Sequence, residues 1–303
     1  MDRLDPRGAA AATMAAVLYG SAYVATAFAL RSFTPLGAAA ARGLLGAALL
    51  GAILLAPAAG AMRPARLSTP AMLRLGVLGL LGGGIFIVAM NVAVAMAGAT
   101  VTAFVAGLYA VLAAALAVPL LGERPEGRTI VSLAVALVGT ALLGDLRHSA
   151  DLAVGIGVGL VAAVSFALFL VFSRRWSGPF GLPGPSVALV ALGMSGIGIG
   201  ALIPILGDPG LDGIVLPEAA AAVIWLAVGP GALAAVLVVT GMRRLPARRA
   251  SAFLLLNPPT AALGGWLLLG ERLSVVQLAG GALVLLAMAG ASGLALPRFE
   301  RRA

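Results

Sequence analysis

The chain contains no cysteine and no lysine, and it has a single histidine, His148. The absence of cysteine excludes disulfides, thiolate metal sites and cysteine nucleophiles. All 20 basic residues are arginine, so a nucleotide site of the P-loop type, which requires a lysine, is excluded as well. Charged residues make up 10% of the 303 residues, whereas soluble domains carry about 25%. Water is therefore not expected to be the main solvent of this chain.

Apolar residues dominate what is present. They account for 61% of the chain, and the mean hydropathy is +1.10. A soluble core cannot bury that much apolar surface, so we expect an all-α integral membrane protein. Interruptions by charge, proline and glycine predict ten transmembrane helices joined by short loops, with no soluble domain. The predicted spans are 9–30, 35–56, 74–97, 101–121, 128–144, 154–173, 185–206, 219–241, 250–269 and 275–294.

The distribution of arginine predicts how these spans are oriented. With the N-terminus in the cytoplasm, 16 of the 20 arginines are cytoplasmic; Arg31, Arg147 and Arg272 fall outside, and Arg42 falls within a span. The positive-inside rule favours this orientation. Ten spans then place both termini in the cytoplasm, and we expect a multi-pass protein of a bacterial cytoplasmic (inner) membrane. The net charge of +9 is assigned to contacts with anionic membrane lipid, not with nucleic acid.

One tripeptide occurs twice, each time after an apolar run that ends in leucine. Gly122-Glu123-Arg124 and Gly270-Glu271-Arg272 are 148 residues apart, and five predicted spans separate them. An odd number of crossings puts the two copies on opposite faces of the membrane. We therefore predict two inverted five-helix repeats, 1–150 and 151–303, an arrangement that many carriers of small molecules share. The tripeptides themselves are expected to fix the turns at the helix ends.

Further motifs resemble a known family. Leu18-Tyr19-Gly20-Ser21-Ala22-Tyr23-Val24 resembles the first span of the EamA-type members of the drug/metabolite transporter superfamily. Arg42 matches a basic residue of their second span, the two Gly-Glu-Arg copies match the ends of the fourth and ninth spans, and Asn257-Pro258 matches a proline of the ninth. The resemblance implies a bundle of two inverted five-helix repeats that exports metabolites by alternating access. Aromatic amino-acid exporters of the YddG type are the subgroup that we expect.

The three tyrosines, Tyr19, Tyr23 and Tyr109, all lie within predicted spans, away from the interface where tyrosine usually collects. Tyr19, Tyr23 and Thr26 share one helix face because they are spaced i, i+4 and i+7, and Ser21 lies nearby but offset. A buried phenol needs a hydrogen-bond partner. Two interpretations remain open: the tyrosines and Ser21 contact an apolar or aromatic substrate, or they join helices to one another.

Phe166 and Phe169 lie i, i+3 on the sixth span, the repeat counterpart of the first, and they are candidates for closing a cavity opposite Tyr19. Lipid-facing phenylalanine is equally ordinary. Asn91 and Asn257 can donate and accept hydrogen bonds, which suits the ammonium and carboxylate groups of a zwitterion. For Asn257 a structural role is equally open, because Pro258 and Pro259 free carbonyl groups that its amide can satisfy.

Four residues are predicted to have structural or gating roles. Pro258 and Pro259 are expected to kink the ninth span, and Pro230, between Gly229 and Gly231, the eighth. The fourth span has Ala110 where the family's paired proline is expected, which puts a hinge there in doubt. Arg42 is expected to reach toward the outer interface and anchor the helix, with attraction of a substrate carboxylate as the sharper alternative.

No acidic residue falls inside a predicted span. Proton-coupled antiporters usually carry a buried carboxylate, so facilitated, gradient-driven export of small neutral metabolites is favoured. A multidrug/metabolite antiporter is the main alternative. A distant one is an intramembrane serine protease, because Gly193-Met194-Ser195-Gly196 is similar to a nucleophile motif, but His148, the base it would need, lies in a predicted external loop. We expect no enzyme, no cofactor, no metal and a monomer with a small-molecule substrate.

Overall fold

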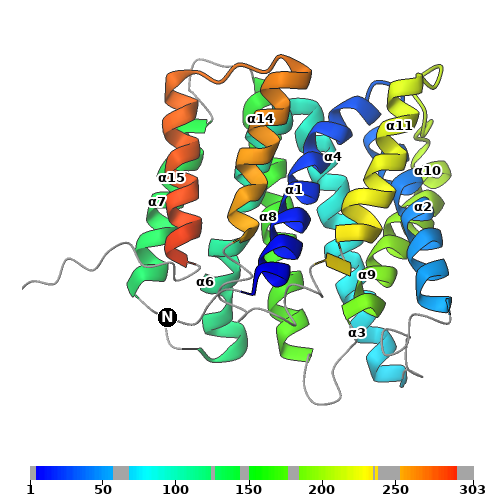
Figure 1. The fold of residues 1–303 in the computed structure, drawn as a ribbon, viewed down its shortest axis with the longest axis horizontal. Coiled ribbons are helices and arrows are strands. Elements are labelled where there is room, and N and C mark those ends of the chain that lie inside the picture. Colours follow the sequence, from blue (N-terminus) through cyan, green and yellow to red (C-terminus); the bar gives the residue numbers. More distant parts are fainter. Residues whose placement is uncertain are drawn as a thin grey trace, which may run out of the picture.

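The computed structural model describes residues 5–56, 68–123, 127–143, 150–176, 184–234, 236–237 and 253–291. This part of the chain forms a bundle of helices that cross between two faces, and the first helix begins at the lower face of Figure 1. It contains no strand within the ranges just given, apart from one isolated bridge between Phe33 and Leu211. Six helices are long and apolar enough to cross a membrane, and four shorter apolar helices accompany them. The predicted all-α membrane fold with ten spans is thus confirmed in class, and each predicted span has a helical counterpart.

The first five spans contain these elements: α1 (Pro6–Ala29); α2 (Pro35–Leu55); α3 (Thr69–Gly79), η2 (Leu80–Ile85) and α4 (Phe86–Ala97); α5 (Ala99–Gly107) and α6 (Tyr109–Leu121); and α7 (Gly127–Leu143). The next five contain α8 (Ala150–Trp176); α9 (Gly184–Gly193), η3 (Met194–Gly198) and α10 (Ile199–Leu206); α11 (Pro217–Leu226) and η4 (Ala227–Leu233); η5 (Leu254–Leu256) and α14 (Asn257–Leu269); and α15 (Val275–Ala291). Proline at the first or second helical position begins α1, α2, α3, α11 and α14, where its missing N–H costs nothing.

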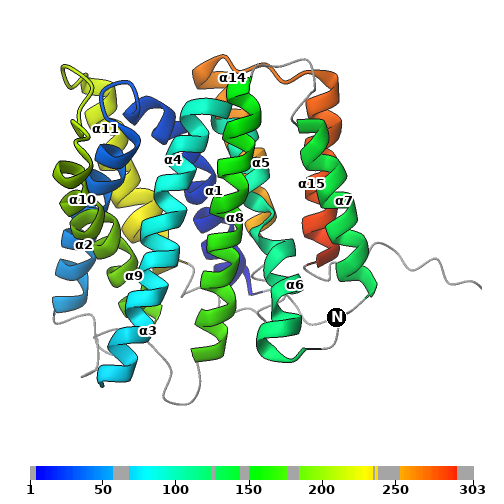
Figure 2. The same ribbon diagram turned by 180° about the vertical axis from the view of Figure 1, so that it is seen from behind.

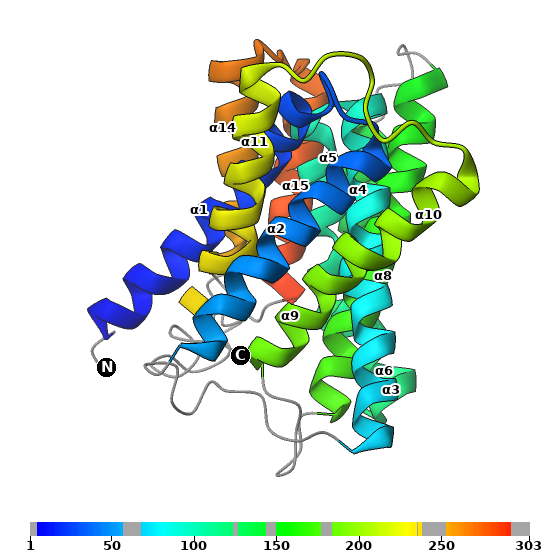
Figure 3. The same ribbon diagram turned by 90° about the vertical axis from the view of Figure 1, so that its right-hand side faces the viewer.

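Consecutive spans alternate in direction. In Figures 1 and 2, α1 rises from the lower to the upper face, whereas α8, the sixth span, descends from the upper to the lower face. The fifth and tenth spans, α7 and α15, lie side by side at one edge of the bundle in both views. Figure 3 shows α2 in front of α4 and beside α9, α10 and α11, at the opposite edge.

Three spans contain a wide turn of π-helix that the sequence did not lead us to expect. These turns are η2, η3 and η4, and each is rich in glycine. Pro230 lies inside η4, so the predicted distortion of the eighth span takes the form of a π-turn. In η2 the Leu81 carbonyl accepts the backbone N–H of Phe86, five residues on, and also a hydrogen bond from Ser165 Oγ of α8 at 2.8 Å. π-turns of this kind often occur at functional sites.

Glycine lets several helices touch through their backbones, as expected in a membrane protein. A Cβ atom on Gly43 of α2 would lie 2.3 Å from the backbone nitrogen of Gly196 in η3, and one on Gly83 of η2 would lie 1.8 Å from the Ala191 carbonyl oxygen. Neither position has room for a side chain. The contacts join the second, third and seventh spans at their glycine-rich turns.

Both Gly-Glu-Arg copies end a helix in the same way. Gly122 (φ 70°) and Gly270 (φ 69°) take the left-handed conformation, which glycine adopts at low cost. The next backbone N–H returns to a carbonyl six residues back: Glu123 to Ala117 at 3.5 Å and Glu271 to Gly265 at 3.0 Å. The two caps lie at opposite faces of the bundle, because α6 ends at the lower face and α14 at the upper face of Figure 1.

Candidate substrate-binding site

The fourth and ninth spans are each interrupted near their middle. Leu108 separates α5 from α6, and the short 3₁₀ turn η5 gives way to α14 at Asn257. The 148-residue shift between the Gly-Glu-Arg copies aligns Tyr109 with Asn257, so the interruptions fall at equivalent positions. The break at Leu108 forms without a proline, although Ala110 had put a hinge there in doubt.

The side chains of Tyr109 and Asn257 meet at these interruptions. A side-chain hydrogen bond joins them, and both residues are buried. Because Asn257 Oδ1 has no partner in the described part of the chain, the amide nitrogen is the donor and the tyrosine oxygen the acceptor. One of the neighbouring carbonyls, that of Leu256, accepts from Thr260 Oγ1 at 2.8 Å.

Arg42 lies against the tyrosine face of α1. Its guanidinium interacts electrostatically with Tyr19 and Tyr23, and Tyr109 interacts with both tyrosines in the same way. Arg42 is 6% exposed, so it does not reach the interface, and the prediction that it snorkels outward is wrong. Tyr23 is also buried, and Tyr19 partly so.

Three phenylalanine rings form a group with Tyr109. Phe166 of α8 lies 4.9 Å from Tyr109 in an edge-to-face arrangement, 4.6 Å from Phe86 of α4 and 5.2 Å from Phe169, as measured between ring centroids. Such separations are favourable for aromatic pairs. Phe169 also packs on Gly82 of η2. The structure thus brings Phe166 and Phe169 to Tyr109. Sequence reasoning missed Phe86, whose only signal was an aromatic residue two positions after the glycine run that ends at Gly84.

Several buried polar atoms in the upper half of the bundle have no hydrogen-bond partner among the described residues. They include Thr26 Oγ1, Asn91 Oδ1 and Thr102 Oγ1, in addition to the atoms of Arg42 and Asn257. Asn91 donates through Nδ2 to the Pro35 carbonyl at 2.9 Å and so ties α4 to the start of α2. Buried polar atoms are usually paired, so this concentration marks the region as one suited to a polar ligand. Thr102 was not predicted.

Ser21 lies elsewhere. Its hydroxyl donates to the Leu18 carbonyl at 2.8 Å and accepts from Trp225 Nε1 of α11 at 2.9 Å. Trp225 is itself exposed on the outside of the bundle. Two residues from either tyrosine, Ser21 faces away from them on α1, so the structure does not bring it into the group.

Ser195, in the motif that suggested a protease, donates from Oγ to the Ala39 carbonyl of α2 at 2.8 Å. The motif forms the π-turn η3 and packs against α2 through Gly196. The hydroxyl therefore joins two helices. His148, which the protease hypothesis needs as a base, lies outside the described residues. Among these residues no group of His, Asp and Glu is suited to a metal.

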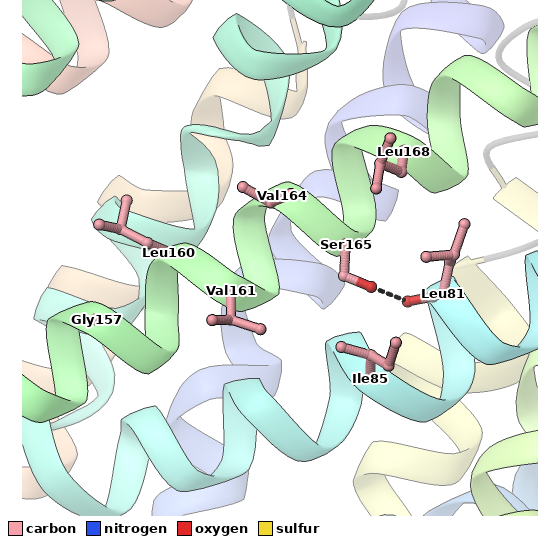
Figure 4. A pocket seen from close by; sticks show the side chains of 8 residues that line it. All are labelled: Leu81, Ile85, Gly157, Leu160, Val161, Val164, Ser165 and Leu168. Atoms are coloured by element: carbon pink, nitrogen blue, oxygen red, sulfur yellow. Dashed lines mark hydrogen bonds between the residues drawn. The ribbon is translucent and has the colours of Figure 1, made fainter.

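A groove of about 380 Å³ lies on the outer surface, between η2 and α8 (Figure 4). Its lining is almost entirely aliphatic, and the single polar side chain, Ser165, is engaged with the Leu81 carbonyl. Val161 and Val164 on its rim are exposed. The groove therefore faces the surroundings of the bundle and is distinct from the buried tyrosines.

Comparison with known proteins identifies the family of this chain. The model of the EamA-like transporter family matches the chain twice, over residues 6–144 and 153–293. The chain belongs to the EamA-like transporter family. It is therefore a multi-pass membrane protein of a transporter family. The YddG-type subgroup expected from the sequence receives no support from this match.

Individual relatives agree with the family. An uncharacterized transporter of Archaeoglobus fulgidus is 33% identical over 169 residues, which cover 55% of this chain and 57% of the relative. An uncharacterized transporter of Clostridium kluyveri is 27% identical over 237 residues, or 75% of each chain. The chain thus aligns with little more than half the length of the archaeal relative. A crystal structure of another protein superposes with a TM-score of 0.67 over 95% of this chain and 99% of its own, at 23% identity, and supports the fold alone.

Proposed function

We propose that this EamA-like transporter exports small neutral metabolites, amino acids with aromatic side chains among them, by alternating access of two inverted five-helix repeats, 1–150 and 151–303. The observation that carries this proposal is the contact between Tyr109 and Asn257. These residues are repeat-equivalent, and each lies at the interruption of its span. Interrupted helices that meet near the membrane midplane are where inverted-repeat carriers hold their substrates.

The proposed substrate lies among Tyr19, Tyr23, Tyr109 and Asn257, with its apolar part against Phe166 and the rings packed on it. Asn91 extends the polar side of the site, and Phe169 supports Phe166 at 5.2 Å. Aromatic rings from α4, α6 and α8 offer faces and edges that suit an aromatic or aliphatic side chain. The π-turn around Pro230 and the break before Pro258 and Pro259 are the proposed points of flexure between states.

The proposed transport is facilitated and independent of protons. In the described helices, acidic side chains occur in first turns, as with Asp151 and Glu218, and none lies in the interior of a span. The buried charge near the tyrosines is the cation of Arg42, which disfavours the alternative of an antiporter for cationic drugs. We place the protein in the bacterial inner membrane with both termini, and the lower face of Figure 1, in the cytoplasm. No enzymatic activity is proposed.

Counterflow in proteoliposomes tests the proposal. Vesicles loaded with unlabelled solute, without a pH gradient, should accumulate the labelled solute when it is an amino acid; nucleosides serve as the comparison panel. Phe166→Ala and Tyr109→Ala should each lower exchange at least tenfold at equal protein level. Phe172→Ala is the matched control, because Phe172 lies on the same helix but stacks on Trp176, 5.1 Å away, outside the ring group.

Two results would refute the proposal. If the wild-type protein exchanges none of the amino acids, the proposed substrate class is wrong. Exchange that requires a pH gradient would remove the facilitated mechanism.

A further inference from the structure

Arg42 brings a positive charge into the interior of the helix bundle, and no described acidic residue pairs with it. It is 6% exposed, and its Nη1 atom has no hydrogen-bond partner in the described ranges. The ion pairs found there are between Arg31 and Glu218 and between Arg174 and Glu123, and neither involves Arg42. An unpaired charge is costly inside a membrane protein and is usually retained for a function.

The position of Arg42 in the bundle is that of a ligand-binding residue. At 1.5 Å per residue, Arg42 lies about 10 Å along α2 from the upper face, Tyr23 about 9 Å along α1, and Tyr19 and Tyr109 about 15 Å along their spans. A hydrocarbon core is about 30 Å thick, so these groups extend from the upper half toward the midplane. Tyr19 and Tyr23 lie within electrostatic range of Arg42, but their neutral phenols do not compensate its charge.

The unpartnered atoms of the site complement one another. Arg42 Nη1 is a donor, whereas Asn257 Oδ1 and Thr26 Oγ1 offer acceptor lone pairs. The tyrosines connect Arg42 with Asn257: Tyr19 and Tyr23 interact with Arg42, and Tyr109 is hydrogen-bonded to Asn257. The cation of Arg42 and the free acceptor Asn257 Oδ1, which lies deeper in the bundle, suit a solute with a carboxylate and an ammonium group.

We propose that Arg42 binds the carboxylate of the transported solute, so that the carrier takes α-amino acids and rejects related compounds that lack the carboxylate. This deepens the proposed function and rests on it. The guanidinium can hold a carboxylate through two parallel hydrogen bonds. The rings around Phe166 then receive the side chain, and Asn257 Oδ1 accepts from the ammonium group.

Three probes separate the parts of this proposal in the counterflow assay. L-Phenylalanine has both charged groups, L-phenylalaninamide lacks the carboxylate, and 3-phenylpropionate lacks the ammonium group. The wild-type protein should exchange phenylalanine at least tenfold faster than the amide, with the propionate between them. Arg42→Gln should slow exchange of phenylalanine at least tenfold and leave the slow exchange of the amide unchanged, and Arg42→Lys should restore part of the difference.

Arg31→Gln is the matched control, since Arg31 has the same charge near the same face but is 47% exposed at the side chain and paired with Glu218; it should behave as wild type. A second measurement does not depend on the folding of any variant: phenylalanine and phenylpropionate should raise the melting temperature of the wild-type protein in detergent, and the amide should not. Equal exchange of phenylalanine and its amide by the wild type, or normal phenylalanine exchange by Arg42→Gln, would overturn the role of Arg42 while the transport function stands. Exchange of no amino acid at all would overturn both.

Discussion

The carboxylate of Glu271 holds the ninth span to the beginning of α5 at the upper face, and its removal gives a quantitative prediction. Oε1 accepts from the backbone N–H of Ala99 at 2.7 Å, and Oε2 accepts from that of Thr100 at 3.0 Å and from the Thr100 hydroxyl. Gly98, with φ 80°, ends α4 immediately before α5. Glu271 therefore caps a helix that begins in the chain 172 residues before it.

The cost of Glu271→Gln follows from these contacts. Hydrogen bonds to a charged group contribute about 1.5–3 kcal/mol each, and a negative charge at a helix N-terminus contributes about 0.3–1 kcal/mol more. Glutamine keeps one acceptor oxygen and presents an NH₂ group to a backbone donor, so we expect a loss of about 3 kcal/mol. At roughly 2–4 °C per kcal/mol for a large domain, the melting temperature in detergent should fall by about 6–12 °C.

Glu123→Gln is the matched control. Glu123 occupies the same place in the other Gly-Glu-Arg copy, but it pairs with Arg174 at 2.9 Å, and the two side chains are 45% and 65% exposed. Exposed pairs contribute about 0–1 kcal/mol, so the melting temperature should fall by less than about 3 °C. Equal shifts for the two variants would refute the reasoning, because the difference in burial and in the number of bonds would then have no energetic effect.

Three further outcomes are expected. Tyr109→Phe keeps the ring against Phe166 but removes the acceptor for Asn257, so amino-acid counterflow should fall less than in Tyr109→Ala, by a factor of about 5–10 for a hydrogen bond of roughly 1 kcal/mol. Gly43→Ala should destabilise the protein by about 1–3 kcal/mol in thermal unfolding, because the new Cβ meets a backbone atom at 2.3 Å. Gly76→Ala, with nothing within 4 Å, should stabilise its helix by up to about 1 kcal/mol. Substrate exchange should proceed at the same rate with and without a pH gradient, as measured by labelled uptake.

Much of the fold follows from hydropathy, because a bilayer requires apolar helices of a minimum length whatever their neighbours are. The start of α2 at Pro35 and the end of the ninth span at Gly270 match the predicted boundaries closely, since proline and glycine act through the local backbone. The shared face of Tyr19 and Tyr23 also required only the helical period.

Features that depend on tertiary contacts were not predictable in this way. The π-turn η2 also has a tertiary partner, because its Leu81 carbonyl accepts a second hydrogen bond from Ser165, 84 residues away. The environment of Arg42 depends on which side of α2 faces α1. The sequence of α2 does not show this, because its apolar residues are spread over all sides of the helix. The break at Leu108 contains no proline, so the sequence held no local signal for its position. The structure shows the break next to the contact between Tyr109 and Asn257.

The two Gly-Glu-Arg copies show how one short motif supports different contacts at the two faces. Gly122 and Gly270 form the same turn, because glycine adopts the left-handed conformation after a helix without help from tertiary contacts. The turn fixes the position of the glutamate that follows, but the neighbouring helix determines its partner. Glu123 meets an exposed arginine, whereas Glu271 meets the buried start of α5. Under the proposed mechanism, opening toward the upper face separates α14 from α5 and breaks the bonds of Glu271. Destabilising that cap should therefore favour the state open to the upper face. The chain has no cysteine, so Thr102→Cys would introduce a single labelling site. Labelling of this site from the upper face should be faster in Glu271→Gln than in Glu123→Gln.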